Sequence, residues 1–276
     1  MIHAWHSGST SRTLVLSLLT VHLALVLAAC GATGPSAVDP SAAPVTESDE
    51  PEQRKRARLR MELASGYFEQ GRTDIALDEI KQALAADTTY APAYVLRGLI
   101  FMQMNNARLA EDSFQRALQL TPRDPDALHN YGWFQCQQGR HAQAVELFNR
   151  ALASPVYGGQ ARTYLAKGVC QVRMGQLAEA EGSLNRSYEL DPANPIAAFN
   201  LAQLLYQRGG EDARAQFIIR RLNNSELANA ETLWLGIKVE RRLGNAVVVE
   251  QLAQQLGRRF SESRQWGSYQ RGAFHE

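Results

Sequence analysis

The amino-acid sequence predicts an all-α fold, a right-handed superhelical solenoid of about six helix pairs. Small residues recur along the chain with a period of 34 residues, and large apolar residues recur between them. Glycines stand near the middle of several of these units, where a left-handed residue would end a first helix. Prolines stand at or near the ends of units, where they stop a second helix because proline has no N–H donor.

Residues 1–29 resemble a lipoprotein signal peptide. A polar start ends in the charged side chain of Arg12, and an apolar stretch then runs to Ala29, interrupted by Ser, Thr and His22. The stretch is short for a membrane-spanning helix, which needs about 20 apolar residues. Its end, "LAAC", resembles a bacterial lipobox, in which the chain is cleaved before the cysteine and lipid is attached to it. The alternative is a plain signal peptide with a cysteine nearby.

We therefore expect lipid on Cys30 to anchor the chain to the periplasmic side of the outer membrane. Gly31 follows the cysteine, where an aspartate would resemble an inner-membrane retention signal. Residues 30–56 are expected to form the lipidated cysteine and a disordered tether, because the segment is rich in Pro, Ala, Ser and acidic residues and holds no aromatic residue. The whole chain has 29 basic and 28 acidic residues, so no nucleic-acid partner is expected.

Four units in register carry the repeat between residues 57 and 190. Small residues fill positions 8, 20 and 27 of each unit, and two extra residues near Gly158 and Gly159 separate the third unit from the fourth. In chain order these residues are Ala64, Ala76, Ala83, Gly98, Ala110, Ala117, Gly132, Ala144, Ala151, Gly168, Ala180 and Ser187. A 34-residue period with small residues at these positions is typical of the tetratricopeptide repeat (TPR).

Two weaker units extend the predicted TPR domain to residues 57–263. The fifth unit keeps Ala202 and Gly209, but its second helix places Ala213 and Phe217 one residue early. The sixth unit keeps "LWLG" and ends in "LGRRF". The remaining residues, 264–276, are predicted to be a flexible tail.

The segment from residue 128 to residue 152 holds a tryptophan, a cysteine and two histidines, which raises the question of a reactive site. His129 and Cys136 are about 10.5 Å apart along a helix axis, too far for a catalytic pair, and His141 lies beyond the turn. A zinc site needs four ligands, or three and an open position. Only two histidines, His129 and His141, lie within the six predicted units. We therefore expect no catalytic residue, no metal and no cofactor. Cys136 and Cys170 lie on first helices of adjacent units, and the sequence leaves open whether they form a disulfide or remain reduced.

First helices of stacked units line a concave groove, which is the expected protein-binding surface. The candidate residues at the groove-facing positions are Val95, Leu99, His129, Trp133, Leu165, Val169, Phe199 and Gln203. The predicted groove is therefore apolar and suits an amphipathic helix or an extended segment of a partner. Trp133 has two interpretations: a side chain packed at the seam between units, or an aromatic platform for a partner.

The lipobox, the tether and the six units together resemble the type IV pilus biogenesis/stability lipoprotein family. The most telling segments are "ALHNYGWFQCQQGRHAQA", "LAQLLYQRGGEDARAQF" and "LWLGIKVERRLGN". His129 stands where the family has the first Asn of N-N-Y-G, and Ser261 where it often has proline.

The resemblance implies a pilotin-like adaptor and not an enzyme. Such a protein binds subunits of the type IV pilus secretin through its TPR surface and promotes their localisation or multimerisation. The implied partners are the secretin and other pilus assembly proteins. The alternative is a generic periplasmic TPR scaffold for envelope protein complexes.

Overall fold

The structure is a computed structural model that describes residues 49–275. This range holds thirteen helices and no strand. The helices are α2 (Glu52–Glu69), α3 (Thr73–Ala86), α4 (Ala91–Gln103), α5 (Ala107–Leu120), α6 (Pro125–Gln137), α7 (His141–Leu152), α8 (Gln160–Arg173), α9 (Leu177–Leu190), α10 (Pro195–Arg208), α11 (Asp212–Asn223), α12 (Ala230–Arg242), α13 (Ala246–Arg259) and α14 (Arg264–Gln270). The predicted signal peptide, the lipidation of Cys30 and most of the tether lie outside the described residues. None of the described helices is both long enough and apolar enough to cross a bilayer.

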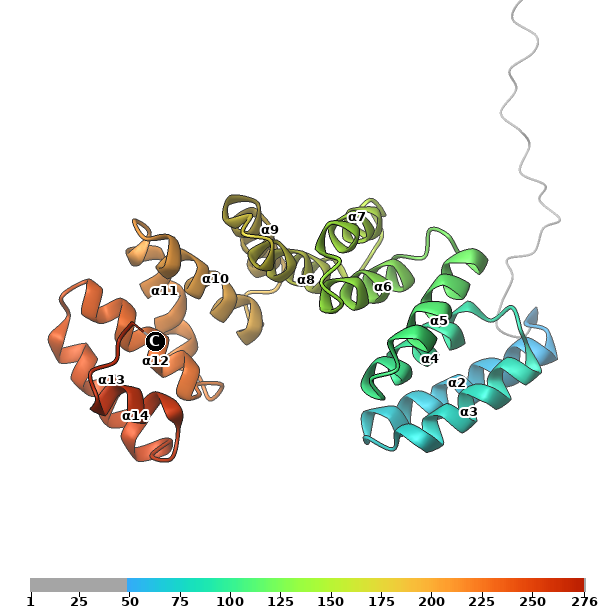
Figure 1. Ribbon diagram of the computed structural model, residues 1–276, viewed down its shortest axis with the longest axis horizontal. Helices are drawn as coiled ribbons and strands as arrows, with labels where there is room; N and C mark the ends of the chain where they lie inside the picture. Colours follow the sequence, from blue (N-terminus) through green and yellow to red (C-terminus); the bar gives the residue numbers. More distant parts are fainter. Residues whose placement is uncertain (1–48, 276) are drawn as a thin grey trace, which may run out of the picture. The chain divides into compact units, whose positions relative to one another are not determined.

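The helices α2 to α13 form six consecutive pairs, from α2 with α3 to α12 with α13 (Figure 1). The two helices of each pair pack against each other, and the second helix of a pair also contacts the first helix of the next. First helices of neighbouring pairs make contacts of their own, such as those of α6 with α8. The predicted all-α arrangement of about six helix pairs is therefore confirmed.

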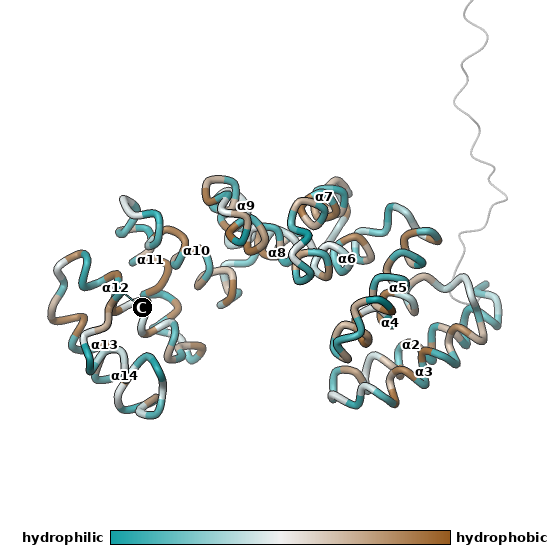
Figure 2. The backbone as a smooth tube through the Cα atoms, in the orientation of Figure 1, coloured by the Kyte–Doolittle hydropathy of each residue, from teal (hydrophilic) through white to brown (hydrophobic). Residues whose placement is uncertain are grey.

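Small residues let the two helices of a pair approach closely. A Cβ atom added to Gly98 in α4 would lie 2.6 Å from the ring of Phe114 in α5, and one added to Gly132 would lie 2.8 Å from the ring of Phe148. Both phenylalanines are fully buried. Apolar and polar residues alternate along most helices (Figure 2), so each helix buries one face and leaves the other to solvent.

A left-handed residue ends the first helix of every pair among residues 49–275. These residues have φ between 56° and 77°, and they are Gly71, Asn105, Gly139, Gly175, Gly209 and Gly244. Five are glycines, which adopt this conformation without the penalty of a Cβ atom. Asn105 is the exception, and asparagine is the non-glycine residue that tolerates it best.

The register of the fifth pair differs from the one predicted. Its second helix, α11, buries Ala215 and Ile219 completely, whereas Phe217 is 69% exposed. The buried residues of α11 therefore come one residue later than the repeat period predicts, and not one residue earlier as the sequence suggested. The cause is the turn after α10, where Gly209 and Gly210 both have positive φ and so add one residue before α11 begins.

Both ends of the repeat region are longer than predicted. Helix α2 begins at Glu52, directly after Pro51, so residues 52–56 are helical and do not belong to the tether. At the other end, residues 264–270 form α14 where a flexible tail was expected. Ser263 caps this helix by accepting a hydrogen bond from the N–H of Trp266 at 3.1 Å, and Trp266 packs against the last pair. Burial of aromatic side chains therefore orders the segment.

Candidate functional site

The predicted groove residues lie on the first helices of four consecutive pairs. Helix α4 carries Val95 and Leu99, α6 carries His129 and Trp133, α8 carries Leu165 and Val169, and α10 carries Phe199 and Gln203. Seven of the eight side chains are half-buried, which suits residues that pack at their base and face a groove at their tip. His129 is the exception.

His129 lies inside the molecule, not on the groove surface. It is only 9% exposed, and its Nδ1 atom lies 2.9 Å from the hydroxyl oxygen of Thr163 in α8. Its ring also contacts the ring of Phe148, with centroids 5.9 Å apart. Burial, followed by the positive charge of Arg162, lowers the pKa of His129 from 6.5 to about 4. His129 is therefore a neutral residue of the seam between the third and fourth pairs, which corrects its assignment to the groove.

Both interpretations that the sequence left open for Trp133 hold in part. The indole packs against a buried cluster that includes Phe148, Ala166 and the two cysteines, so it closes the seam between α6 and α8. Part of the side chain remains accessible, and the guanidinium of Arg173 lies 5.8 Å from its ring centroid. The exposed part of Trp133 is available to a partner, with a cation beside it.

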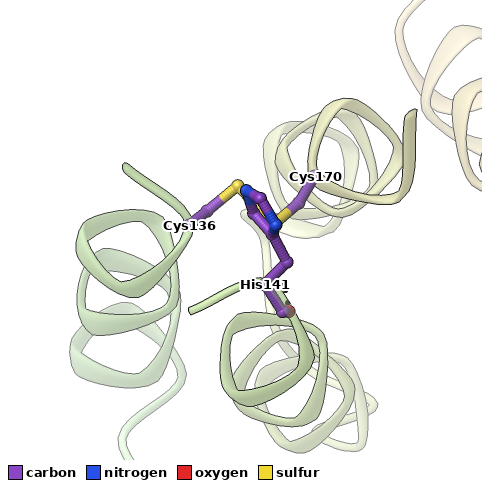
Figure 3. Close-up of a disulfide and its surroundings, with 3 residues drawn as sticks. All are labelled: Cys136, His141 and Cys170. Carbon is purple, nitrogen blue, oxygen red and sulfur yellow. Dashed lines mark hydrogen bonds between the residues drawn. A yellow bond between two sulfur atoms is a disulfide. The ribbon is translucent and has the colours of Figure 1, made fainter. Parts of the chain in front are cut away.

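Cys136 and Cys170 form a disulfide that joins α6 to α8, with Cα atoms 5.9 Å apart (Figure 3). Both cysteines are buried. The two positions are 34 residues apart, one repeat period, so the bond links equivalent helices of successive pairs. The imidazole of His141, at the start of α7, lies beside the two sulfur atoms (Figure 3).

Phe199 and Gln203 line a pocket of about 620 Å³ at the C-terminal end of the repeat region. Helix α12 and the segment after α13 supply the other walls. The further lining residues are Tyr206, Gln207, Glu231, Trp234, Leu235, Lys238, Arg242, Arg264, Gln265, Ser268, Phe274 and His275. We refer to this site as the C-terminal pocket.

The C-terminal pocket contains cationic side chains that lie beside aromatic rings. The guanidinium of Arg242 lies 3.6 Å from the ring centroid of Tyr206, and it donates to Asp212 at 3.0 Å. The ammonium of Lys238 lies 5.7 Å from the ring of Tyr206 and 5.6 Å from that of Trp234. Burial and the charge of Arg242 lower the pKa of Lys238. Desolvated cations beside apolar rings bind carboxylates more strongly than cations in water do.

The sequence predicted an apolar groove and missed these cations, because no groove residue was assigned on α12. A signal was nevertheless present. Trp234, Lys238 and Arg242 are spaced four residues apart and therefore lie on one face of α12. The contribution of Phe274 carried no such signal, because it depends on how the segment after α14 folds back onto Trp234.

The sequence pattern of the tetratricopeptide repeat family matches residues 95–157 and 165–217. PilF of Pseudomonas aeruginosa, described as a type IV pilus assembly protein, is 26% identical over 211 residues, which cover 76% of this chain and 83% of PilF. The crystal structure of PilW, described as a widely conserved type IV pilus biogenesis factor, superposes with a TM-score of 0.71 at 29% identity and covers 77% of this chain and 97% of PilW.

Some relatives match over a smaller part of their own length. The BBSome complex member BBS4 of Xenopus tropicalis is 27% identical over 136 residues, which cover 49% of this chain but only 26% of BBS4. The resemblance to BBS4 is therefore one between stretches of helical repeats, whereas the resemblance to PilF and PilW takes in most of both chains.

Proposed function

Because the chain is a tetratricopeptide-repeat protein related to the type IV pilus proteins PilF and PilW, we propose that it acts in type IV pilus biogenesis. In this role it is a lipid-anchored adaptor on the periplasmic side of the outer membrane. It binds secretin subunits through its TPR surface and promotes their localisation or multimerisation. Its function is binding, with no reaction.

The observation that carries the proposal is the extent of the match to PilF and PilW. The match to BBS4, which shares helical repeats with this chain, covers only 26% of that protein. The match instead covers 83% of PilF and 97% of PilW. This coverage, together with sequence identities of 26% to PilF and 29% to PilW and a TM-score of 0.71 with PilW, favours a pilus function over the generic envelope scaffold.

The finer parts of the proposal rest on the sequence resemblance. Lipid on Cys30 would supply the anchor, and the predicted tether, which ends before α2, would join it to the repeat domain. The binding surface would be the groove from Val95 to Gln203 together with the C-terminal pocket. Apolar rings and the half-buried ammonium of Lys238 fit a partner segment that carries both apolar side chains and carboxylates.

Deletion of the gene tests the pilus function. We expect fewer secretin multimers on immunoblots of the outer membrane and fewer surface pili in electron micrographs, both restored by the wild-type gene. Complementation with the Cys30→Ala variant should restore neither the secretin multimers nor the pili, because the variant should not reach the outer membrane. Normal multimers and pili in the deletion strain would contradict the proposal and leave the generic scaffold.

Two variants test the binding surface with the purified secretin. Phe199→Ser removes an aromatic side chain from the C-terminal pocket, and Lys238→Glu reverses a charge there. Each should weaken secretin binding at least about 10-fold, the loss expected for a residue at the centre of an interface. The matched controls are Phe217→Ser, which changes an exposed phenylalanine of the same helix pair, and Lys55→Glu on α2. Equal binding by all four variants, each with unchanged melting temperature, would remove the pocket from the binding surface.

A further inference from the structure

Three potential metal ligands converge on one point between three helices (Figure 3). Cys136 comes from the last turn of α6, His141 begins α7, and Cys170 lies in α8. The two Sγ atoms and an imidazole nitrogen all lie within 4.8 Å of one another. A disulfide between the cysteines explains the position of the two sulfur atoms but gives the imidazole no function.

The donor set suits a thiophilic d¹⁰ cation. Two thiolates and an imidazole, with an open fourth position, form a recognised tetrahedral site for Zn²⁺. Ligand atoms in such a site are about 3.5–3.8 Å apart, given zinc–sulfur bonds of about 2.3 Å and zinc–nitrogen bonds of about 2.0 Å. Once the two sulfur atoms are no longer bonded to each other, shifts of about 1 Å would bring the three ligands to these separations.

The surroundings of the cluster suit a neutral complex. Cys136 and Cys170 are 1% and 0% exposed, and they pack against Ala144, Phe148 and Ala166. An apolar environment disfavours an isolated charge. Two thiolates and a divalent cation sum to zero charge, and a neutral imidazole adds none. The complex therefore avoids the penalty that either partner alone would incur in this environment.

His141 provides access from solvent. Its side chain is half-buried and lines a surface pocket together with Gly139, Arg140, Gln143 and Met174. The pocket offers a path by which a cation can reach the buried sulfur atoms, and space in which water can occupy the fourth position.

We propose that the reduced form of this cluster is a Zn²⁺-binding site, so that the seam between the third and fourth pairs is closed either by a disulfide or by a metal ion. A dithiol reductant transfers two electrons and two protons to the disulfide, and it is itself oxidised to a disulfide. The two thiols then lose their protons as Zn²⁺ binds both sulfur atoms and the imidazole. Reoxidation by a disulfide-bond-forming oxidant releases the ion and restores the covalent link.

Zinc competition measured on the full-length chain carrying Cys30→Ser tests the proposal, since this background leaves only the two cysteines in question. The chain reduced with a phosphine should bind one equivalent of Zn²⁺, and the oxidised chain should bind none. Co²⁺ in place of Zn²⁺ should give a thiolate-to-metal charge-transfer band. His141→Ala should lower the affinity on the order of 100-fold, because a ligand is lost while both thiols remain. His275→Ala, which changes an exposed histidine, should leave the affinity unchanged.

Folding is followed by circular dichroism in the same samples. If the reduced, metal-free chain loses helicity, zinc should restore it in the parent chain but not in the His141→Ala variant. The proposal is overturned if the reduced chain binds zinc no more tightly than the Cys136→Ser/Cys170→Ser variant, or if zinc fails to restore an unfolded reduced chain. Equal affinities of the parent chain and His141→Ala would remove the imidazole from the site.

Discussion

The Nδ1 atom of His129 lies 2.9 Å from the hydroxyl oxygen of Thr163, 34 residues further along the chain. The contact joins the first helices of two successive pairs inside the protein. The threonine hydroxyl also lies 3.0 Å from the backbone oxygen of Gly159, to which it donates. A protonated His129 would place a charge in this buried seam, which explains the direction of its pKa shift.

We predict that His129 makes stability fall with decreasing pH. Its pKa is about 4 in the folded chain and 6.5 in an ordinary environment, so the unfolded chain takes up the proton first. The stabilisation is complete above pH 6.5 and is lost as the pH falls towards 4, where the loss is about 2–3 kcal/mol. Urea unfolding between pH 7 and pH 4 should show that the free energy of unfolding depends less steeply on pH in His129→Asn than in the wild type. Parallel curves for wild type and His129→Asn would contradict the prediction.

Gly98→Ala and Gly66→Ala should change stability in opposite directions. The new methyl at position 98 meets the buried ring of Phe114 at 2.6 Å, and overpacking of this kind costs about 1–3 kcal/mol. The methyl at position 66 meets nothing within 4 Å, so alanine should stabilise helix α2 by about 0.5–1 kcal/mol. Thermal melts of the two variants provide the measurement. Two shifts of the same sign would show that close approach does not decide the residue at position 98.

Reduction of the disulfide between Cys136 and Cys170 should destabilise the chain when no metal is present. The bond closes a loop across 34 residues, and the chain-entropy treatment gives about 3–4 kcal/mol for such a loop. Guanidinium unfolding with and without a phosphine, in the presence of a chelator, measures the difference. The Cys136→Ser/Cys170→Ser variant should not respond to the phosphine. An unchanged midpoint in the wild type would mean that strain or residual structure in the unfolded chain offsets the entropy.

Glu240→Ala should destabilise the sixth pair. The carboxylate is buried in α12 and accepts hydrogen bonds from Arg220 in α11 at 2.9 Å, from Gln216 at 2.8 Å and from Asn245 at 2.7 Å. Burial raises the pKa of Glu240, but these bonds outweigh it and hold the pKa below the ordinary value of 4.5. The residue therefore stabilises the chain above pH 4.5, and this contribution is lost as the pH falls through the lowered pKa. Because Arg220 is 45% exposed and water can replace its partner, we expect a loss of about 1–2 kcal/mol at pH 7.

Urea unfolding of Glu240→Ala at pH 7 and pH 3 measures both parts of this prediction. The difference from wild type should be smaller at pH 3. Glu226→Ala, which changes an exposed glutamate in the loop before α12, should unfold like the wild type at pH 7. A Glu240→Ala variant as stable as wild type at pH 7 would show that desolvation of the carboxylate cancels its hydrogen bonds.

Repetition made most of the fold predictable. Helix pairs, buried small residues and left-handed turns each recur at a fixed offset, so one unit predicts the next. The fifth pair departed where one extra glycine, Gly210, moved α11 by a single residue. Helix α14 differed more from the prediction, because it has no counterpart in the other units and packs Trp266 against Gly257.

The site was harder to predict, because periodic spacing gives the face of a helix but not the depth of a side chain. His129 shares its repeat position with Val95, yet its side chain is buried and contacts the hydroxyl of Thr163. Only the three-dimensional arrangement reveals this contact. The sequence placed Cys136 and Cys170 on adjacent helices correctly. It could not bring His141 to them, because that depends on the angle at which α7 leaves the turn at Gly139.

Helix α14 also has a consequence for self-association. In a stacked array the outermost apolar face at each end is a potential docking site for another copy. At the C-terminal end Trp266 covers Gly257, and the ring of Phe274 stacks on Trp234 with centroids 5.4 Å apart. The residues of α14 and Phe274 thus cover apolar surface of the last pair, which leaves less of that surface for end-to-end contact with a second copy.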